Sequence, residues 1–247
     1  MHPTLPGPLG PLVFLCSLAL VPVATGADAA AGRAGIAPFD AAYVVKAAGI
    51  TAAAARGRFR IDGEGRYVYA RTVRPRGLLA LFRDDRIEER SEGRWTPDGP
   101  VPERYRYDHY KGDSVRSEVI EFRPDGRIHA TRRGRVYDLQ APPGTLDRVA
   151  QELALMLDMA RGRSELRYRV FDKGKIRDYR YRQTGREHTE VPFGRYECIR
   201  LEVERHSTKR ETRFCLAPAL GFLPLWVEHV EKGSTSRMEL ESFEPAG

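Results

Sequence analysis

Short segments in which apolar and polar residues alternate run through most of the chain, and this alternation constrains the fold more than any other feature. Examples are R-Y-V-Y-A-R-T-V at 66–73, S-V-R-S-E-V-I-E-F at 114–122 and K-I-R-D-Y-R-Y-R at 175–182. A period of two places successive side chains on opposite faces of a strand, so one face of the sheet is buried. Turns such as D-G-E-G, K-G-D, P-D-G and D-K-G separate the segments, and connections this short join antiparallel neighbours. We therefore expect a mainly β protein of about ten to twelve strands.

One segment departs from this pattern and predicts an amphipathic helix over about residues 146–161. Pro142, Pro143 and Gly144 exclude an earlier start, Thr145 can cap the helix, and Gly162 ends it. One face of the helix is apolar and is expected to pack on the sheet; it consists of Leu146, Val149, Ala150, Leu153, Met156, Leu157 and Ala160.

The opposite face of this helix is also apolar in its second half, where Leu155 and Met159 stand. Either a loop or strand covers these two side chains, or they line a cavity for an apolar ligand in the mouth of a curved sheet. We expect one large antiparallel sheet curved into an open or half barrel, with the helix packed on its concave side.

Arginine and tyrosine alternate in three of the predicted strands. The alternation places aromatic rings on one face of the sheet and guanidinium groups on the other. Arginine interleaved with aromatic residues can bind single-stranded nucleic acid, but a buried tyrosine face beside a solvated arginine face is commoner, and we expect no nucleic-acid partner. The tyrosines expected to form cavity walls are Tyr105, Tyr107, Tyr179 and Tyr181.

The N-terminal region is typical of a secretory signal peptide. Residues 1–26 carry no charged side chain and include an apolar run at 11–23 that is too short to span a membrane comfortably. We expect a signal peptide over 1–26, a linker over 27–37 and a single domain over 38–247, located in the periplasm. An uncleaved anchor in the inner membrane is the alternative.

The formal net charge is +7, and nearly all the basic residues are arginine. A GC-rich genome explains this bias as readily as a function does. A basic secreted protein meets anionic lipid headgroups and cell-wall polymers first, so an anionic membrane surface is a possible partner.

No motif of catalysis or cofactor binding stands out. The histidines lack metal-ligand spacing, and there is no G-x-S-x-G sequence or phosphate loop. Turn and capping roles explain the carboxylates that a hydrolase would need, namely Asp40, Glu89, Asp147 and Asp172. We therefore expect no enzyme activity, no cofactor and no metal.

Cys198 and Cys215 are the only cysteines after residue 26. Their two strand-like arms are expected to turn about His206 and Ser207, which would place the cysteines directly opposite each other. An oxidising compartment would then permit a disulfide. Two buried free thiols are the alternative.

Several motifs together resemble a bacterial envelope family called domain of unknown function 3108. They include F-D-A-x-Y at 39–43, R-P-R-G-L at 74–78, P-P-G-T-L-D at 142–147, V-P-F-G-R-Y at 191–196 and L-A-P-A-L-G-F-L-P at 216–224. The chain departs from the family at Cys198 and Cys215, where the family pattern has a small residue and Trp, and a joint change to cysteine fits a disulfide. The resemblance implies no catalytic residues. A looser similarity to periplasmic lipoprotein carriers implies an open half-barrel with helices across its mouth.

Two functions agree with these observations. The first is a periplasmic binding protein for a lipid, acyl chain or other amphiphile that serves envelope maintenance. The second is an interaction module that docks another envelope protein or the cell wall through an exposed sheet edge. Pro218 and Pro224 interrupt the C-terminal strands and suit such an edge or a bend. A cavity larger than a few water molecules would favour the first function.

Overall fold

The computed structural model describes residues 35–77, 80, 85–204 and 210–246. Residues Ala34–Gly247 form one compact unit. The signal peptide expected over 1–26, and the expected linker up to residue 34, lie outside the described residues.

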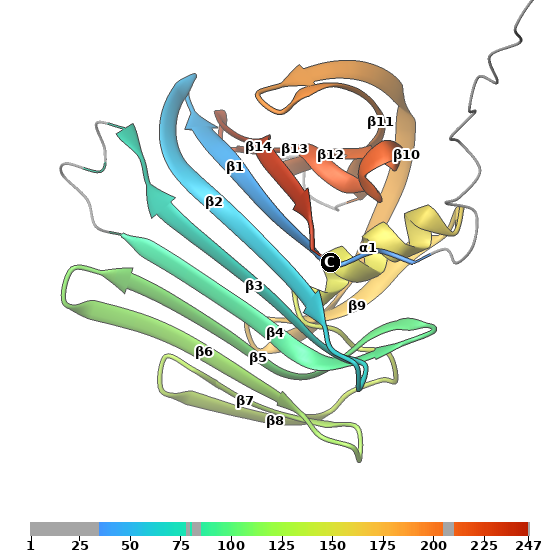
Figure 1. Ribbon diagram of the computed structural model, residues 1–247. Coiled ribbons are helices and arrows are strands. Elements are labelled where there is room, and N and C mark those ends of the chain that lie inside the picture. Colours follow the sequence, from blue (N-terminus) through green and yellow to red (C-terminus); the bar gives the residue numbers. More distant parts are fainter. Residues whose placement is uncertain (1–34, 78–79, 81–84, 205–209, 247) are drawn as a thin grey trace, which may run out of the picture. The chain divides into compact units, whose positions relative to one another are not determined.

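The described chain contains fourteen strands in one antiparallel sheet that is not closed (Figure 1). The strands are β1 Phe39–Ala47, β2 Ile50–Ile61, β3 Arg66–Pro75, β4 Arg86–Thr96, β5 Gly99–Lys111, β6 Ser114–Phe122, β7 Arg127–Arg132, β8 Arg135–Gln140, β9 Leu166–Asp172, β10 Lys175–Val191, β11 Gly194–Glu204, β12 Arg210–Ala217, β13 Leu223–Glu231 and β14 Ser234–Pro245. The expected fold class is therefore confirmed, although the expected number of strands was too low. The sequence pattern does not predict the strand β4, because the polar residues Glu89 and Ser91 occupy its buried positions and the strand lacks apolar alternation.

Two meanders build the sheet. Its order is β8-β7-β6-β5-β4-β3-β2-β1-β14-β13-β12-β11-β10-β9, so the first and last strands pair in the middle. The edges are β8 and β9, and the segment that joins them contains the helix.

Of the two roles expected for Pro218 and Pro224, the sheet edge is wrong, because β12 and β13 are interior strands, and the bend is confirmed. Pro218 begins a short 3-10 turn, Pro218–Leu220, between these strands. Pro224 lies opposite Leu216, next to a bulge where the register shifts, and a bulge tolerates a residue without a backbone N–H.

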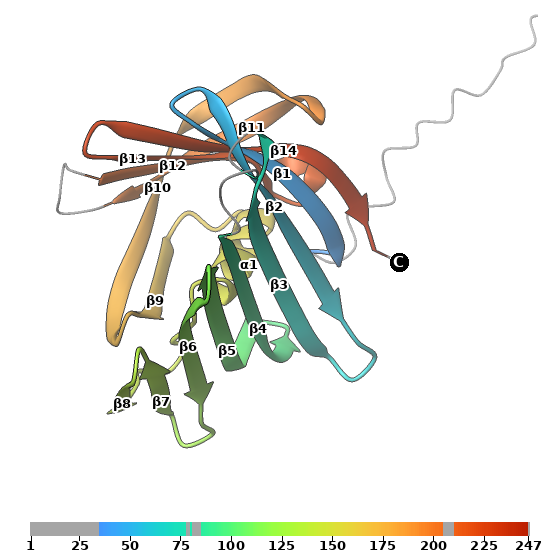
Figure 2. The ribbon, with the colours of Figure 1, turned by 90° about the vertical axis from the view of Figure 1, so that its left-hand side faces the viewer.

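The helix α1, Ala150–Ala160, lies on the concave side of the sheet (Figures 1 and 2). It begins later than expected, and Asp147 rather than Thr145 does the capping: Asp147 Oδ1 accepts hydrogen bonds of 2.9 Å from the N–H groups of Val149 and Ala150. The Thr145 hydroxyl donates to the carbonyl of Pro142 instead. Among the described residues, no helix has the length and hydropathy needed to cross a membrane.

Both long faces of α1 are buried because the sheet curves around it. Val149, Leu153 and Met156 belong to the large core cluster that includes the aromatic side chains of β1–β5. Leu155 and Met159 belong to a second cluster, formed with apolar side chains of β9–β12. The apolar second face of the helix therefore packs against the other end of the same sheet.

The arginine and tyrosine faces lie as predicted. Tyr105 and Tyr181 are buried, whereas Arg104, Arg106 and Arg180 on the same strands are exposed. At these positions the tyrosine side of the strand is buried and the arginine side is solvated.

Cys198 and Cys215 form a disulfide with their Cα atoms 5.4 Å apart. The expected register, however, is wrong by two residues: Arg200 lies opposite Cys215, so the two cysteines are diagonal neighbours. A shift by an even number of residues keeps both side chains on one face, which is why the pairing survives. The turn expected at His206 and Ser207 lies outside the described residues.

Replacing Cys198 and Cys215 together by serine is expected to destabilise the protein by about 3 kcal/mol. The reason is that the disulfide joins two residues that are 17 positions apart and so restricts the unfolded chain. Thermal unfolding of the oxidised protein measures the loss. Reducing the unmodified protein provides the matched control and should lower its melting temperature to that of the variant. Two titratable thiols in the oxidised, denatured chain that begins at residue 27 would contradict the pairing.

Candidate functional site

Charged side chains occupy the concave face of the sheet beneath the start of α1. Arg71 of β3 pairs with Glu89 of β4, which in turn lies opposite Tyr107 of β5. Arg71 follows the buried Tyr67 and Tyr69 at a spacing of two, so strand alternation directs its guanidinium inward.

These residues form an ion cluster that consists of Arg71, Glu89, Tyr105, Arg148 and Glu152. One oxygen of Glu89 accepts a hydrogen bond from Arg71. The other accepts one from the Tyr105 hydroxyl at 2.7 Å and one from Arg148 at 2.9 Å. Arg71 also pairs with Glu152 on α1. The cluster therefore ties the helix and the turn before it to three strands.

Glu89 is the centre of this cluster and stays ionised. Burial by itself raises the pKa of a carboxyl group, but the positive charges of Arg71 and Arg148 lower the pKa of Glu89 to about 2. Its folded pKa lies below its unfolded pKa. The stabilisation is therefore present above about pH 4.5 and is lost as the pH falls toward 2.

Asp147 links the start of the helix to the same strands. Ser91 donates a hydrogen bond of 2.6 Å to Asp147 Oδ2, and the Tyr67 hydroxyl lies 2.8 Å from the Ser91 oxygen. The side chain of Asp147 is completely buried. Burial raises the pKa of Asp147 to about 6, although hydrogen bonds from Ala150 and Ser91 oppose this shift.

An apolar cavity of about 300 Å³ lies between α1, the strands β1–β3 and the strands β12–β14. Hydrocarbon and aromatic side chains form most of its wall, and Arg71 and Glu152 contribute a polar patch. The lining residues are Tyr43, Ala55, Arg56, Gly57, Tyr69, Arg71, Thr72, Val73, Glu152, Leu155, Met156, Phe214, Leu216, Pro224, Val227 and Met238.

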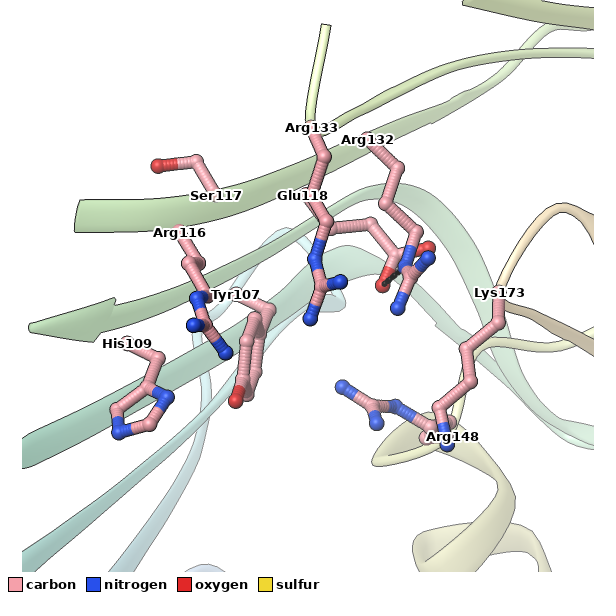
Figure 3. Close-up of a pocket in the computed structure, with 9 residues that line it drawn as sticks. All are labelled: Tyr107, His109, Arg116, Ser117, Glu118, Arg132, Arg133, Arg148 and Lys173. Atoms are coloured by element: carbon pink, nitrogen blue, oxygen red, sulfur yellow. Dashed lines mark ion pairs between the residues drawn. The ribbon is translucent and has the colours of Figure 1, made fainter. Parts of the chain in front are cut away.

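A second, basic cavity of about 210 Å³ lies over β5–β7 (Figure 3). Its lining residues are Tyr107, His109, Arg116, Ser117, Glu118, Arg132, Arg133, Arg148 and Lys173. The ion cluster contributes to both cavities, because Arg71 and Glu152 line the apolar one and Arg148 lines the basic one. Two sites of opposite character thus share one buried network.

The six residues that were expected to line one cavity lie in several different places. Leu155 lines the apolar cavity and Tyr107 lines the basic one. Tyr179 lines a third cavity with Asp172 and Arg210. The other three are buried in the protein interior: Met159 packs among the side chains of β9–β11, the Tyr181 hydroxyl donates to Gln151, and Tyr105 belongs to the ion cluster.

The four carboxylates considered for hydrolysis do not gather in one cleft. Glu89 and Asp147 lie close together, but hydrogen bonds occupy both oxygens of each. Asp172 pairs with Arg177 at 3.4 Å and with Arg148, a partner of Glu89, at 3.9 Å. Asp40 lies elsewhere on β1, where it pairs with two arginines of β2.

Arg71, Arg148 and Glu152 were not anticipated as members of a site. Arg148 and Glu152 have the spacing of an ordinary polar helix face, and Arg71 is one of several arginines within its strand. The sequence does contain one indication of this site. Arg71 follows Tyr67 and Tyr69 at a spacing of two, so its charged side chain lies on the same, buried face of the strand.

Comparison with known proteins identifies the family and the fold. The family described as "Protein of unknown function (DUF3108)" matches residues 41–241. No curated protein matches the chain.

Among solved structures, the chain is similar to a beta-barrel-like protein of domain of unknown function DUF1849 from Brucella abortus. The TM-score is 0.58 at 10% identity, with 86% of this chain and 99% of that chain covered. This similarity shows a shared fold. A protein provisionally named a lipoprotein, from Parabacteroides distasonis, gives a TM-score of 0.36 at 8% identity over 86% of this chain and 97% of that one.

Asp147→Asn is expected to change how stability depends on pH. Because the folded pKa of Asp147 is raised from 3.8 to about 6, the native state binds the additional proton between these values, and stability falls as the pH rises through this window. Asparagine can keep the cap without ionising. Relative to the unmodified protein, the variant should gain about 3 kcal/mol in its free energy of unfolding between pH 4 and pH 7.5.

Urea denaturation at a series of pH values measures this difference. The loss of stability below pH 4.5, which comes from Glu89, should persist in the variant and serves as an internal control. Parallel pH profiles for the two proteins between pH 4 and 7.5 would contradict the role of Asp147.

Proposed function

The chain belongs to the DUF3108 family, and from this premise we propose that it is a non-enzymatic envelope protein that holds the apolar part of a lipid, acyl chain or other amphiphile in its apolar cavity. The cavity is the observation that carries the proposal. Its volume of about 300 Å³ far exceeds the share of a few water molecules, which occupy about 30 Å³ each in the liquid.

The composition of the wall supports an apolar occupant. Leu155, Val227 and Met238 come from three separate elements and present hydrocarbon to the same space. Small-molecule sites typically start at about 300 Å³ and combine an apolar wall with a few placed polar groups. The Arg71–Glu152 pair supplies such groups. A single acyl chain therefore fits better than a whole phospholipid.

Features of the sequence support an envelope location and a binding role. Residues 1–26 have the pattern of a signal peptide, and the net charge of +7 favours contact with anionic envelope surfaces. Both oxygens of Glu89 and of Asp147 accept hydrogen bonds from other groups of the protein, which fits a structural role for these carboxylates better than a catalytic one.

The second candidate is an interaction module that docks a protein partner through the sheet edge. The edge strand β8 carries Val136, which is 59% exposed. An unpaired edge with an exposed apolar residue can accept another strand. The apolar cavity favours the first candidate, because edge pairing does not require it.

Val227→Trp is expected to abolish the binding of dodecanoate or to weaken it at least about tenfold, because the indole fills the apolar cavity. The measurement is displacement of the fluorescent probe 1-N-phenylnaphthylamine by dodecanoate from the purified protein. Val230→Trp is the matched control. Val230 is three residues along the same strand, on the opposite face of the sheet, and it does not line this cavity.

Thermal unfolding checks that both tryptophan variants fold, and lipid extraction with mass spectrometry of the protein from its native envelope identifies the occupant. Saturable binding that is lost in Val227→Trp and kept in Val230→Trp supports the proposal. No saturable binding by the unmodified protein, or an equal loss in both variants, overturns it in favour of the interaction module.

A further inference from the structure

The basic cavity gathers cationic side chains from several parts of the chain. Arg116 comes from β6, Arg132 and Arg133 from the end of β7, Arg148 from the turn before α1, and Lys173 from the turn between β9 and β10. In Figure 3, Arg148 and Lys173 approach from the side opposite the strands, and the guanidinium group of Arg148 points toward those of Arg132 and Arg133. Five cations therefore surround a cavity of about 210 Å³.

Strand pairing aligns the side chains of β5, β6 and β7 that line the basic cavity. Arg116 lies opposite His109, and Glu118 lies between Tyr107 on one neighbouring strand and Arg132 on the other. All of them share the concave face of the sheet. The ion cluster positions Arg148 from the other side through its bond to Glu89.

Lys173 is positioned by a tight turn at the sheet edge. Gly174 follows it with a positive φ of 79°, and any side chain at Gly174 would overlap the ring of Tyr137 from β8. The edge strand β8 thus packs against the β9–β10 turn and holds Lys173 over the cavity.

The positive charge of the basic cavity is only partly balanced. Arg148 pairs with Glu89 and lies 3.9 Å from Asp172, and Arg132 lies 3.7 Å from Glu118. Within residues 35–246, as far as the structure describes them, no ion pair engages Arg116, Arg133 or Lys173. Like charges held this close repel one another, so a bound anion would stabilise the arrangement.

Glu118 adds a second observation, which marks this cavity as a functional site, although its carboxylate charge does not itself favour an anion. Its side chain is 5% exposed, and its Oε1 atom is buried without a hydrogen-bond partner among the described residues. A buried polar atom without a partner costs free energy, and functional sites are among the places that retain one. Glu118 is one of the residues that line the basic cavity.

We propose that the basic cavity is a binding site for a phosphate group, held by Arg116, Arg132, Arg133, Arg148 and Lys173. Planar guanidinium groups bind phosphate oxygens in a bidentate manner, and a lysine supplies a further point charge. The cavity is smaller than the usual range for drug-sized ligands, which suits one phosphate group rather than a whole nucleotide.

The phosphate can belong to a soluble phosphate compound or to the headgroup of a lipid. The site does not depend on the apolar cavity, because the two cavities have no lining residue in common. Failure of acyl-chain binding would therefore leave this proposal intact.

The test compares two triple variants of the purified protein by isothermal titration calorimetry at constant ionic strength. Arg116→Gln/Arg133→Gln/Lys173→Gln removes three exposed cations that have no ion pair. The matched control, Arg104→Gln/Arg135→Gln/Lys175→Gln, removes the same charge from exposed positions nearby that do not line the cavity. The probes are inorganic phosphate, dihexanoylphosphatidic acid and dihexanoylglycerol.

The unmodified protein and the control are expected to bind a phosphate-bearing probe, and the first triple variant should bind it at least about tenfold more weakly. Glu118→Gln removes the carboxylate charge from the cavity and should tighten binding about threefold or more. Binding of inorganic phosphate as tight as that of dihexanoylphosphatidic acid identifies a soluble phosphate compound. Binding of the lipid alone identifies a headgroup.

Three outcomes would overturn the proposal. The first is no saturable binding of either phosphate-bearing probe. The second is an equal loss of binding in both triple variants, which would indicate attraction by net charge alone. The third is equal affinity for dihexanoylglycerol, which lacks phosphate.

Discussion

The carboxylate of Glu89 is the contact on which the interior of this protein depends. It receives hydrogen bonds from Arg71, Tyr105 and Arg148, and so connects the strands β3–β5 with the turn that starts α1. Burying charges costs free energy, and the cost is offset only when every charge has close partners. Since the cluster meets this condition, the helix has one defined position inside the curved sheet.

That position creates two cavities of opposite character. On one side of the ion cluster the sheet and helix leave a space with apolar walls, and on the other side basic side chains converge. A helix with two buried faces cannot fill a curved sheet completely, because it is a straight rod against a curved surface. The apolar cavity lies between α1 and the strands, whereas the basic cavity lies over β5–β7 beside the turn before α1, and the residues that line each cavity determine what it can bind.

Much of the fold follows from local pattern. A period of two predicted most of the strands and also which faces are buried, as Tyr105 and Tyr181 show. Proline and glycine punctuation predicted the helix between β8 and β9. The pattern failed on β4, where Glu89 and Ser91 occupy buried positions. A charged residue in the core is visible only once its partners, which are distant in sequence, are known.

The sequence by itself determined the type of most elements, the buried face of most strands and the face shared by Cys198 and Cys215. Tertiary structure decided the register that makes these cysteines diagonal neighbours, and it separated Leu155, which lines a cavity, from Met159, which strands cover. The physical reason is that periodicity encodes the direction of a side chain. What that side chain meets depends on strand pairs that close over long separations, such as β1 with β14.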